Sequence, residues 1–183
     1  DNPGGGSYGD SPVLLKAMVE AGLENAAFAV ISDPEVAAAA MQAGEGAELS
    51  MPLGGKFDPS IAPPFDMTGT VTKTSLEGRF IFEGPMMRGV EALMGPSAVI
   101  QIGGVETVVI TNRFQAYDRM FFAHFDIMPE KKSVVAVKSA HHFRAAYGPM
   151  AREIILVDAA GITSPDPKKF SYQKVRRPIW PLD

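Results

Sequence analysis

Four polar side chains gather in one short stretch of the sequence, and their types suit the binding of an anion. They follow the apolar run 134–137 and are Lys138, Ser139, His142 and Arg144. An ammonium, a hydroxyl, an imidazole and a guanidinium can each donate a hydrogen bond to a carboxylate or to a developing oxyanion. The apolar run predicts a buried strand, and the Ala-rich residues after it favour a helix. The four side chains are therefore expected where a strand ends and a helix begins.

This junction has a functional interpretation and a structural one. In open α/β sheets, ligands bind at the carboxyl ends of strands, where helix N-termini offer free amide donors. Ser139 also stands where a helix N-cap is expected, and a capped helix with a solvated basic turn would explain the same residues without a ligand. From these residues alone, both interpretations stay open.

The glycine-rich start of the chain is a second candidate for anion binding. Asp1 and Asn2 precede Gly4, Gly5 and Gly6, with Pro3 between them. Three consecutive glycines could form a nest of backbone amides around an anion. The alternative is a flexible interdomain turn.

Lys56 is a third candidate, because it follows Gly54 and Gly55 in a predicted turn. The stretch is not a P-loop: Ser50 stands where the motif needs its first glycine, and Phe57 stands where serine or threonine would bind magnesium. We therefore expect a turn in which Lys56 contacts an anion.

Ligands for a metal ion are scarce. The sequence has 3 histidines and no cysteine, and it contains no His-Glu-x-x-His motif. His141 and His142 are adjacent, so on a helix their side chains would point ~100° apart and could not readily share one ion. No metal site is expected within this segment. Ser139 beside Lys138 has the parts of an activated nucleophile, but the sequence lacks a Gly-x-Ser-x-Gly elbow.

The elements that would position these residues follow from hydrophobic spacing and turn residues. Helices are predicted at 13–21, 34–43 and 118–124, and after residue 140. Strands are predicted at 28–31, 47–53, 67–75, 79–82, 98–102, 105–110, 134–137 and 154–157. Gly103 and Gly104 separate two of these strands, as in a tight hairpin. We therefore expect an α/β fold, with a mixed sheet that is antiparallel in its central hairpins and parallel at its flanks.

The composition excludes several classes of protein. Of the 183 residues, 46% are hydrophobic and 21% are charged, which is typical of a globular domain. A net charge of -4 argues against a general nucleic-acid binder. No apolar run is long enough to span a bilayer. The absence of cysteine fits a reducing compartment, so a cytoplasmic protein is expected.

The two ends of the chain suggest a piece of a longer protein. The first residues form a loop without an initiator methionine, which resembles a seam between domains. We expect residues 1–183 to form one domain, with 1–10 as an interdomain loop and 172–183 as an extended C-terminal strap. Prolines exclude a helix in the strap, and its single tryptophan, Trp180, is expected to anchor it.

Five motifs occur in a fixed order along the chain. They are Asp1-Asn2-Pro3-Gly4-Gly5-Gly6, Leu53-Gly54-Gly55-Lys56, Gly103-Gly104-Val105, Lys138-Ser139-Ala140-His141-His142-Phe143-Arg144-Ala145-Ala146 and Arg176-Arg177-Pro178-Ile179-Trp180-Pro181-Leu182-Asp183. This order resembles the C-terminal domain of the MlrC-like family, which is named for microcystinase C. The likeness covers essentially the whole chain. In the family's Lys-Ser-x-x-His-Phe-Arg-Ala-Ala motif, the histidine falls on His142.

The resemblance implies a bacterial zinc-dependent peptidase or amidohydrolase whose metal is held by an N-terminal domain outside this segment. Lys138, Ser139, His142 and Arg144 would then face the cleft and hold a carboxylate or an oxyanion of a small peptide or amide substrate. The loop from Asp1 to Gly6 would line the same cleft. The segment alone would hold no zinc and would not hydrolyse substrate. The alternative is a non-catalytic scaffold or interaction domain that positions a partner domain or subunit. Oligomeric state stays open, with a homo-oligomer as one option.

Overall fold

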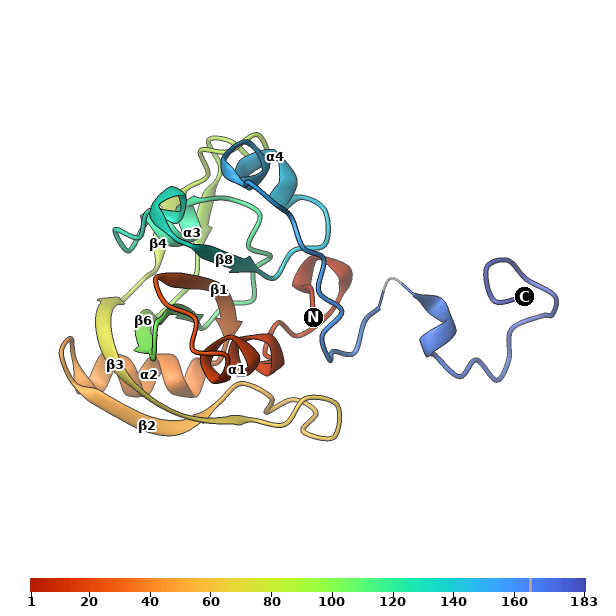
Figure 1. Ribbon diagram of the computed structural model, residues 1–183, viewed down its shortest axis with the longest axis horizontal. Helices are drawn as coiled ribbons and strands as arrows, with labels where there is room; N and C mark the ends of the chain where they lie inside the picture. Colours follow the sequence, from red (N-terminus) through yellow and green to blue (C-terminus); the bar gives the residue numbers. More distant parts are fainter. Residues whose placement is uncertain (165) are drawn as a thin grey trace.

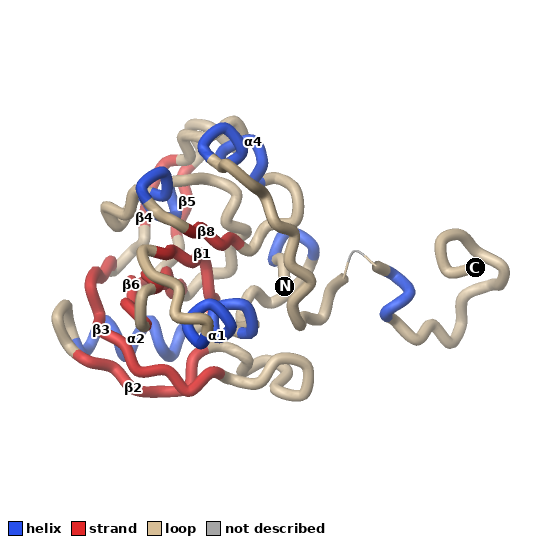
Figure 2. The backbone as a smooth tube through the Cα atoms, viewed as in Figure 1, coloured by secondary structure: helices blue, strands red, loops and turns tan. Residues whose placement is uncertain are grey.

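A six-stranded mixed sheet forms the centre of the chain, and helices lie on both of its faces (Figures 1 and 2). The structure is a computed structural model that describes residues 1–164 and 166–183. The strands are β1 (Ala26–Ser32), β2 (Glu48–Leu53), β3 (Phe65–Ser75), β4 (Arg79–Ile81), β5 (Glu91–Leu93), β6 (Ser97–Ile102), β7 (Val105–Ile110) and β8 (Val134–Val137). The helices are α1 (Val13–Glu20), α2 (Pro34–Ala43), α3 (Met120–Ala123) and α4 (Phe143–Tyr147), with 3-10 turns at Pro3–Gly5, Pro129–Lys131, Gly148–Met150 and Pro167–Lys169.

The strand order β2-β3-β6-β7-β1-β8 confirms the predicted α/β fold with a mixed sheet. β1 is parallel to both of its neighbours, β7 and β8, whereas β2, β3, β6 and β7 pair antiparallel. The parallel pairs thus lie on one side of the sheet only. The predicted hairpin is confirmed as β6 and β7, whose turn contains Gly103 with a φ of 55°. A side chain at Gly104 would meet the Leu23 carbonyl oxygen at 2.1 Å, so both glycines are required there.

Two hydrophobic clusters bury the sheet on both faces. α1 and α2 cover one face, where Leu15 and Val36 pack with Phe28 of β1. α3 and α4 cover the other face, where Phe121 and Tyr147 pack in a second cluster. β1 is therefore buried at every residue, which explains its continuous apolar sequence. The same burial fixes the carboxyl end of β1 in the interior, next to the stretch that begins with Lys138.

Two expectations for the C-terminal region are wrong. The predicted strand at 154–157 does not form: the segment is irregular and belongs to no sheet of the described residues. Trp180 does not anchor the tail, because its side chain is 87% exposed. Residues 151–183, which we call the C-terminal arm, leave the body of the domain near α4, and their distal half projects away from it (Figure 1). β4 falls within the strand predicted at 79–82, whereas its partner β5 and the late start of α4 at Phe143 were not predicted.

His124 predicts a measurable effect of pH on stability. Its Nε2 lies 2.9 Å from Ser75 Oγ, and its ring packs edge-on against Phe125. Burial lowers the pKa of His124, and the nearby Asp126 carboxylate opposes this only in part. The unfolded chain therefore binds a proton near its ordinary pKa of about 6.5, where the folded chain does not. This contribution to stability is present at neutral pH and is lost as the pH falls below about 6.5.

Urea unfolding at pH 7.5 and pH 5.5 tests this effect. The free energy of unfolding should fall between pH 7.5 and pH 5.5, and the fall should be smaller for His124→Gln than for the unsubstituted chain. Equal pH dependence in both proteins would contradict the assignment.

Candidate functional site

The carboxyl ends of two parallel strands, β1 and β8, form the floor of the candidate site. Ala29 of β1 lies opposite Val137 of β8, and the Lys138 amide donates to the Ala29 carbonyl at 2.9 Å. Lys138 therefore lies directly beyond the strand end, as the sequence predicted. The N-terminal loop, residues 1–11, folds over this edge, because the Ser32 amide donates to the Gly9 carbonyl at 3.0 Å.

The Asp1 carboxylate occupies the centre of this edge. It accepts hydrogen bonds from the Gly9 amide at 3.0 Å and the Ser11 amide at 2.8 Å, and a third from the Ser7 hydroxyl. Lys138 Nζ donates to the Asp1 carboxylate at 2.8 Å and to the Gly9 carbonyl at 2.7 Å. The Asp1 and Lys138 side chains are only 6% and 7% exposed. An anion-binding corner thus exists here, and a carboxylate of the same chain fills it.

Two opposing effects act on the charge of Lys138. Burial favours the neutral amine and lowers the Lys138 pKa. Contact with the Asp1 carboxylate and the Gly9 carbonyl favours the ammonium form. A deeply buried ion pair needs further hydrogen bonds to offset its desolvation, and here the Asp1 carboxylate has three other donors while Lys138 Nζ has the Gly9 carbonyl as a second acceptor. The Asp1–Lys138 pair therefore holds the N-terminal loop against the carboxyl end of β8.

Ser139, Gln115 and His142 form a chain of polar contacts beside this ion pair. Gln115 Nε2 donates to Ser139 Oγ at 2.8 Å, and Gln115 Oε1 lies 3.3 Å from His142 Nδ1. Because an amide oxygen only accepts, this contact places the proton on Nδ1 and leaves Nε2 as the free ring nitrogen. Ser139 Oγ also accepts from the Phe143 amide at 3.2 Å, so it supports the first turn of α4. Ser139 is not the N-cap that the sequence predicted, because α4 begins at Phe143 and its N-cap residue is His142.

The glycine-rich loop packs against the same glutamine. A Cβ at Gly4 would lie 2.0 Å from Gln115 Oε1, so this position has no room for a side chain without moving Gln115. The loop amides already have acceptors: Gly4 donates to the Asn2 side chain at 3.1 Å, Gly5 to the Asn2 carbonyl at 2.9 Å and Gly6 to the Pro3 carbonyl at 3.0 Å. The three glycines are exposed, so the loop presents a bare backbone surface next to His142.

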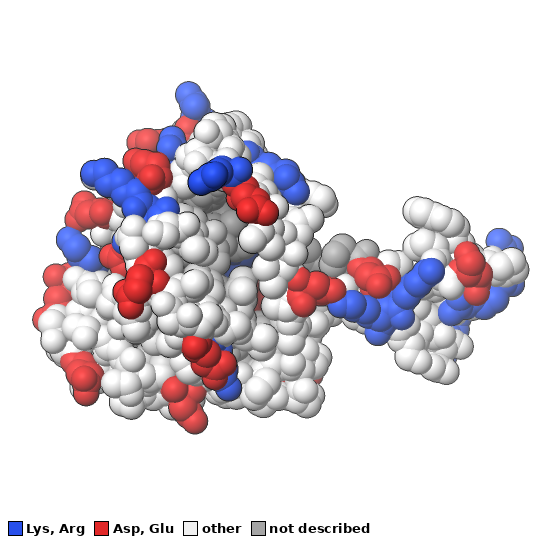
Figure 3. All heavy atoms as spheres, in the orientation of Figure 1, with Lys and Arg blue, Asp and Glu red and all other residues white. Residues whose placement is uncertain are grey.

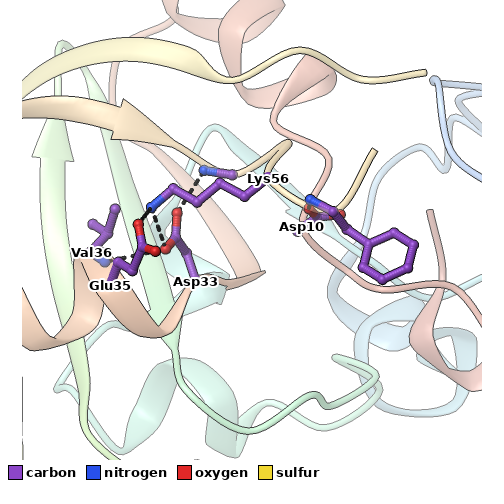
Figure 4. A network of polar contacts seen from close by, with 7 residues as sticks. Asp10, Asp33, Glu35, Val36 and Lys56 are labelled. Atoms are coloured by element: carbon purple, nitrogen blue, oxygen red, sulfur yellow. Dashed lines mark hydrogen bonds and ion pairs between the residues drawn. The ribbon is translucent and has the colours of Figure 1, made fainter. Parts of the chain in front are cut away.

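Lys56 lies in a separate network at the start of α2 (Figure 4). Its Nζ is 2.9 Å from Asp33 Oδ1 and 2.7 Å from Glu35 Oε2. Asp33 also caps α2 by accepting from the Val36 amide at 3.2 Å, and it accepts from the Gly54 amide at 2.8 Å. Partial burial alone would lower the pKa of Lys56, but the Asp33 and Glu35 carboxylates that face its ammonium outweigh this and raise the pKa above its ordinary value. The structure does not bring Lys56 together with Lys138 or His142 in one set of contacts.

The outer side of the site is formed by exposed cationic and imidazole groups. His141, His142 and Arg144 are all exposed, and the Arg144 guanidinium lies 5.4 Å from the ring centre of the neighbouring Phe143. Among residues 1–164 and 166–183, no three His, Asp or Glu side chains are grouped so that they could hold a metal ion. Within the same residues, no helix is long and apolar enough to cross a membrane.

Comparison with known proteins assigns the family. The family model described as the MlrC C-terminus matches residues 1–174. This chain belongs to that family. Microcystinase C from Sphingomonas sp. is 31% identical to it over 183 residues, which is 100% of this chain. A crystal structure from Mesorhizobium sp. BNC1, of a protein provisionally assigned as a metallopeptidase, matches 96% of the chain with a TM-score of 0.82 and 31% identity.

These MlrC-family relatives are much longer than the chain described here. It spans 34% of the length of microcystinase C and 35% of the Mesorhizobium protein. Both relatives therefore contain further regions to which no part of this MlrC C-terminal chain corresponds. The Mesorhizobium protein shares the fold over 96% of this chain, and about two thirds of each relative lies outside the matched region.

Proposed function

We propose that this chain is the C-terminal region of a zinc-dependent peptidase or amidohydrolase, and that it lines a cleft whose metal ion is held by another region of the same protein. The family assignment and the likeness to microcystinase C and to the Mesorhizobium protein support a hydrolase. Metal ligands are expected outside the described residues, because these contain no suitable cluster. When bound, zinc would supply an activated water and polarise the scissile carbonyl.

The observation that carries the proposal is the position of His142. Its side chain is exposed but held at one nitrogen by Gln115, and it adjoins the exposed backbone of Gly4–Gly6. A neutral histidine with a fixed orientation and an unprotonated Nε2 is suited to accept a hydrogen bond or a proton from a substrate or from water.

In this proposal, the predicted site residues divide into two roles. His142 and Arg144 contact the substrate, where Arg144 holds a carboxylate of a small peptide or amide. Lys138 and Ser139 position the site: Lys138 fixes the Asp1 loop, and Ser139 fixes Gln115 and the first turn of α4. Asn2 and the three glycines shape the cleft wall through their backbone.

Metal analysis of the full-length protein tests the hydrolase assignment. We expect at least one tightly bound zinc ion per protein molecule. Chelation should abolish the hydrolysis of linear peptide amides, and adding zinc back should restore it. The 183-residue chain alone should hold no stoichiometric zinc after dialysis. Full-length protein that hydrolyses peptides equally well without metal would overturn the proposal.

Gly4→Ala tests the contact between the glycine-rich loop and Gln115, the side chain that holds His142. The new methyl group has to displace the Gln115 side chain, and His142 then loses its fixed orientation. We expect turnover of the full-length enzyme to fall roughly 10- to 100-fold, because small misplacements of active-site groups have effects of this size. Stability should change little, since the displaced atoms are the end of a flexible side chain.

Gly5→Ala is the matched control for this substitution. A Cβ at Gly5 has its nearest neighbour, Asn2 Nδ2, at 3.6 Å, so it fits without displacing anything. Steady-state kinetics should show normal turnover for Gly5→Ala. Equal losses in both variants would mean that the loop, and not Gln115, is what the substitutions disturb.

A further inference from the structure

The C-terminal arm contains an apolar run without a partner. Ile154, Ile155, Leu156 and Val157 are consecutive, and their side chains are 36%, 74%, 64% and 55% exposed. Folded domains rarely leave a contiguous run of large apolar side chains in water, and such surfaces mark interaction sites. The run lies outside both hydrophobic clusters of the domain.

The backbone of this run is also unpaired. Within the described residues, the amides and carbonyls of 153–157 make no hydrogen bond to any other group. An extended segment with free donors and acceptors is ready to pair with the edge of a sheet. The sequence predicted a strand here because of the same apolar residues, so the residues favour a strand that this domain alone does not complete.

The pattern of the run indicates what kind of sheet it fits. A strand with one solvated face alternates apolar and polar residues, whereas a strand covered on both faces is apolar throughout. Four apolar residues in a row therefore predict a strand that is covered on both faces. A strand of this kind has to join a sheet whose two faces are both covered by other elements. Packing one face of the run against a flat surface would leave its other face in water.

The arm passes the place where the chain begins. A Cβ built at Gly161 would lie 3.1 Å from both the Cα and the backbone nitrogen of Asp1. The matched family model describes a C-terminal region, and the relatives are about three times as long as this chain. In such a protein, the polypeptide that precedes Asp1 enters beside the arm, within a few residues of the apolar run.

We propose that the C-terminal arm is an interdomain clamp, in which Ile154–Val157 adds as a strand to a β-sheet in the region of the same polypeptide that precedes Asp1. Beyond this run, a turn at the end of the arm is held by Asp183, which accepts from the Ile179 amide and Arg177, both at 2.8 Å. Trp180 lies within this turn and is 87% exposed, so it offers a second apolar side chain for the same contact. Lys, Arg, Asp and Glu side chains are spread over the projecting part of the arm (Figure 3). The clamp rests on the proposed presence of a preceding region, and not on the catalytic role of His142.

Hydrogen–deuterium exchange of the full-length protein tests the clamp. Amides of 154–157 should exchange about 100-fold more slowly, or slower still, than the amides of an unstructured peptide with the same sequence, because strand pairing protects them. Leu156→Asp in the full-length protein should remove this protection. Leu76→Asp is the matched control, since Leu76 is a similarly exposed leucine, at 71%, in the turn between β3 and β4. The control should leave the protection of 154–157 unchanged.

Three results would overturn the clamp. Unprotected amides in the full-length protein would show that the run stays free. Protection that disappears on dilution, together with a change from dimer to monomer in light scattering, would assign the partner as a second copy of the protein. Protection that persists in Leu156→Asp would show that the apolar side chains do not make the contact. Zinc content and hydrolysis, measured on the same samples, report on the proposed function separately.

Discussion

Replacing Lys138 by methionine is expected to lower the free energy of unfolding by about 3–5 kcal/mol, the cost of leaving a buried charge without its partner. Methionine keeps the unbranched shape and most of the length of the side chain, but it leaves the Asp1 carboxylate with only the Gly9 and Ser11 amides and the Ser7 hydroxyl. The Asp1 side chain is only 6% exposed, so water cannot replace the ammonium without opening the loop. Chemical denaturation followed by circular dichroism gives the value.

Two further variants make this result specific to the ion pair. Lys16→Met removes a lysine that is 52% exposed and 3.7 Å from Glu20 on α1, and it should cost no more than about 0.5 kcal/mol. Asp1→Asn combined with Lys138→Met should be more stable than Lys138→Met alone, because the unpaired charge is then gone. A Lys138→Met variant as stable as Lys16→Met would mean that the pair contributes nothing.

The second large effect concerns His142. Replacing it by alanine in the full-length enzyme should lower kcat by about 10²–10⁴-fold, the range that a positioned proton donor or acceptor contributes. The melting temperature should stay within about a degree or two, because the side chain is exposed and makes one contact, to Gln115. Kinetics with a linear peptide substrate and differential scanning calorimetry on the same preparations provide the comparison.

His141→Ala is the control for this second prediction. His141 is the neighbouring residue, it is also exposed, and no side-chain contact holds it in the described structure. Its removal should leave turnover within about twofold of the unsubstituted enzyme. If both histidine variants are fully active, the catalytic role of this corner is refuted, and a scaffold function for the domain gains support.

The sequence predicted those elements whose periodicity or turn residues are local. β1, α2 and the β6–β7 hairpin follow from an apolar run, from a capping residue at Ser32 or Asp33 followed by Pro34, and from Gly103-Gly104. The structure places the cap at Asp33. The run 154–157 has the same local features as a strand, yet a strand also needs a neighbour to accept its hydrogen bonds. That neighbour is not specified by the residues of the run itself, which is why the prediction was wrong for this chain.

The candidate site was predictable in part. The cluster after β8 was found from its residue types. Asp1 was a candidate because it belongs to the glycine-rich loop at the start of the chain. Nothing in the sequence indicates that these two residues, 137 positions apart, form one ion pair. Gln115 was missed altogether, because a lone glutamine carries no motif. Only the parallel pairing of β1 with β8, and the return of the N-terminal loop over their ends, brings these groups together.

The bond between Asp1 and Lys138 also limits how this protein can move and how it can be shortened. The loop cannot swing away from the sheet at its first residue without breaking this pair, because the Asp1 side chain is tied to the strand end by Lys138. A fragment that starts at Asn2 would lose the counter-ion of that lysine, so a shortened form of this chain has to retain Asp1.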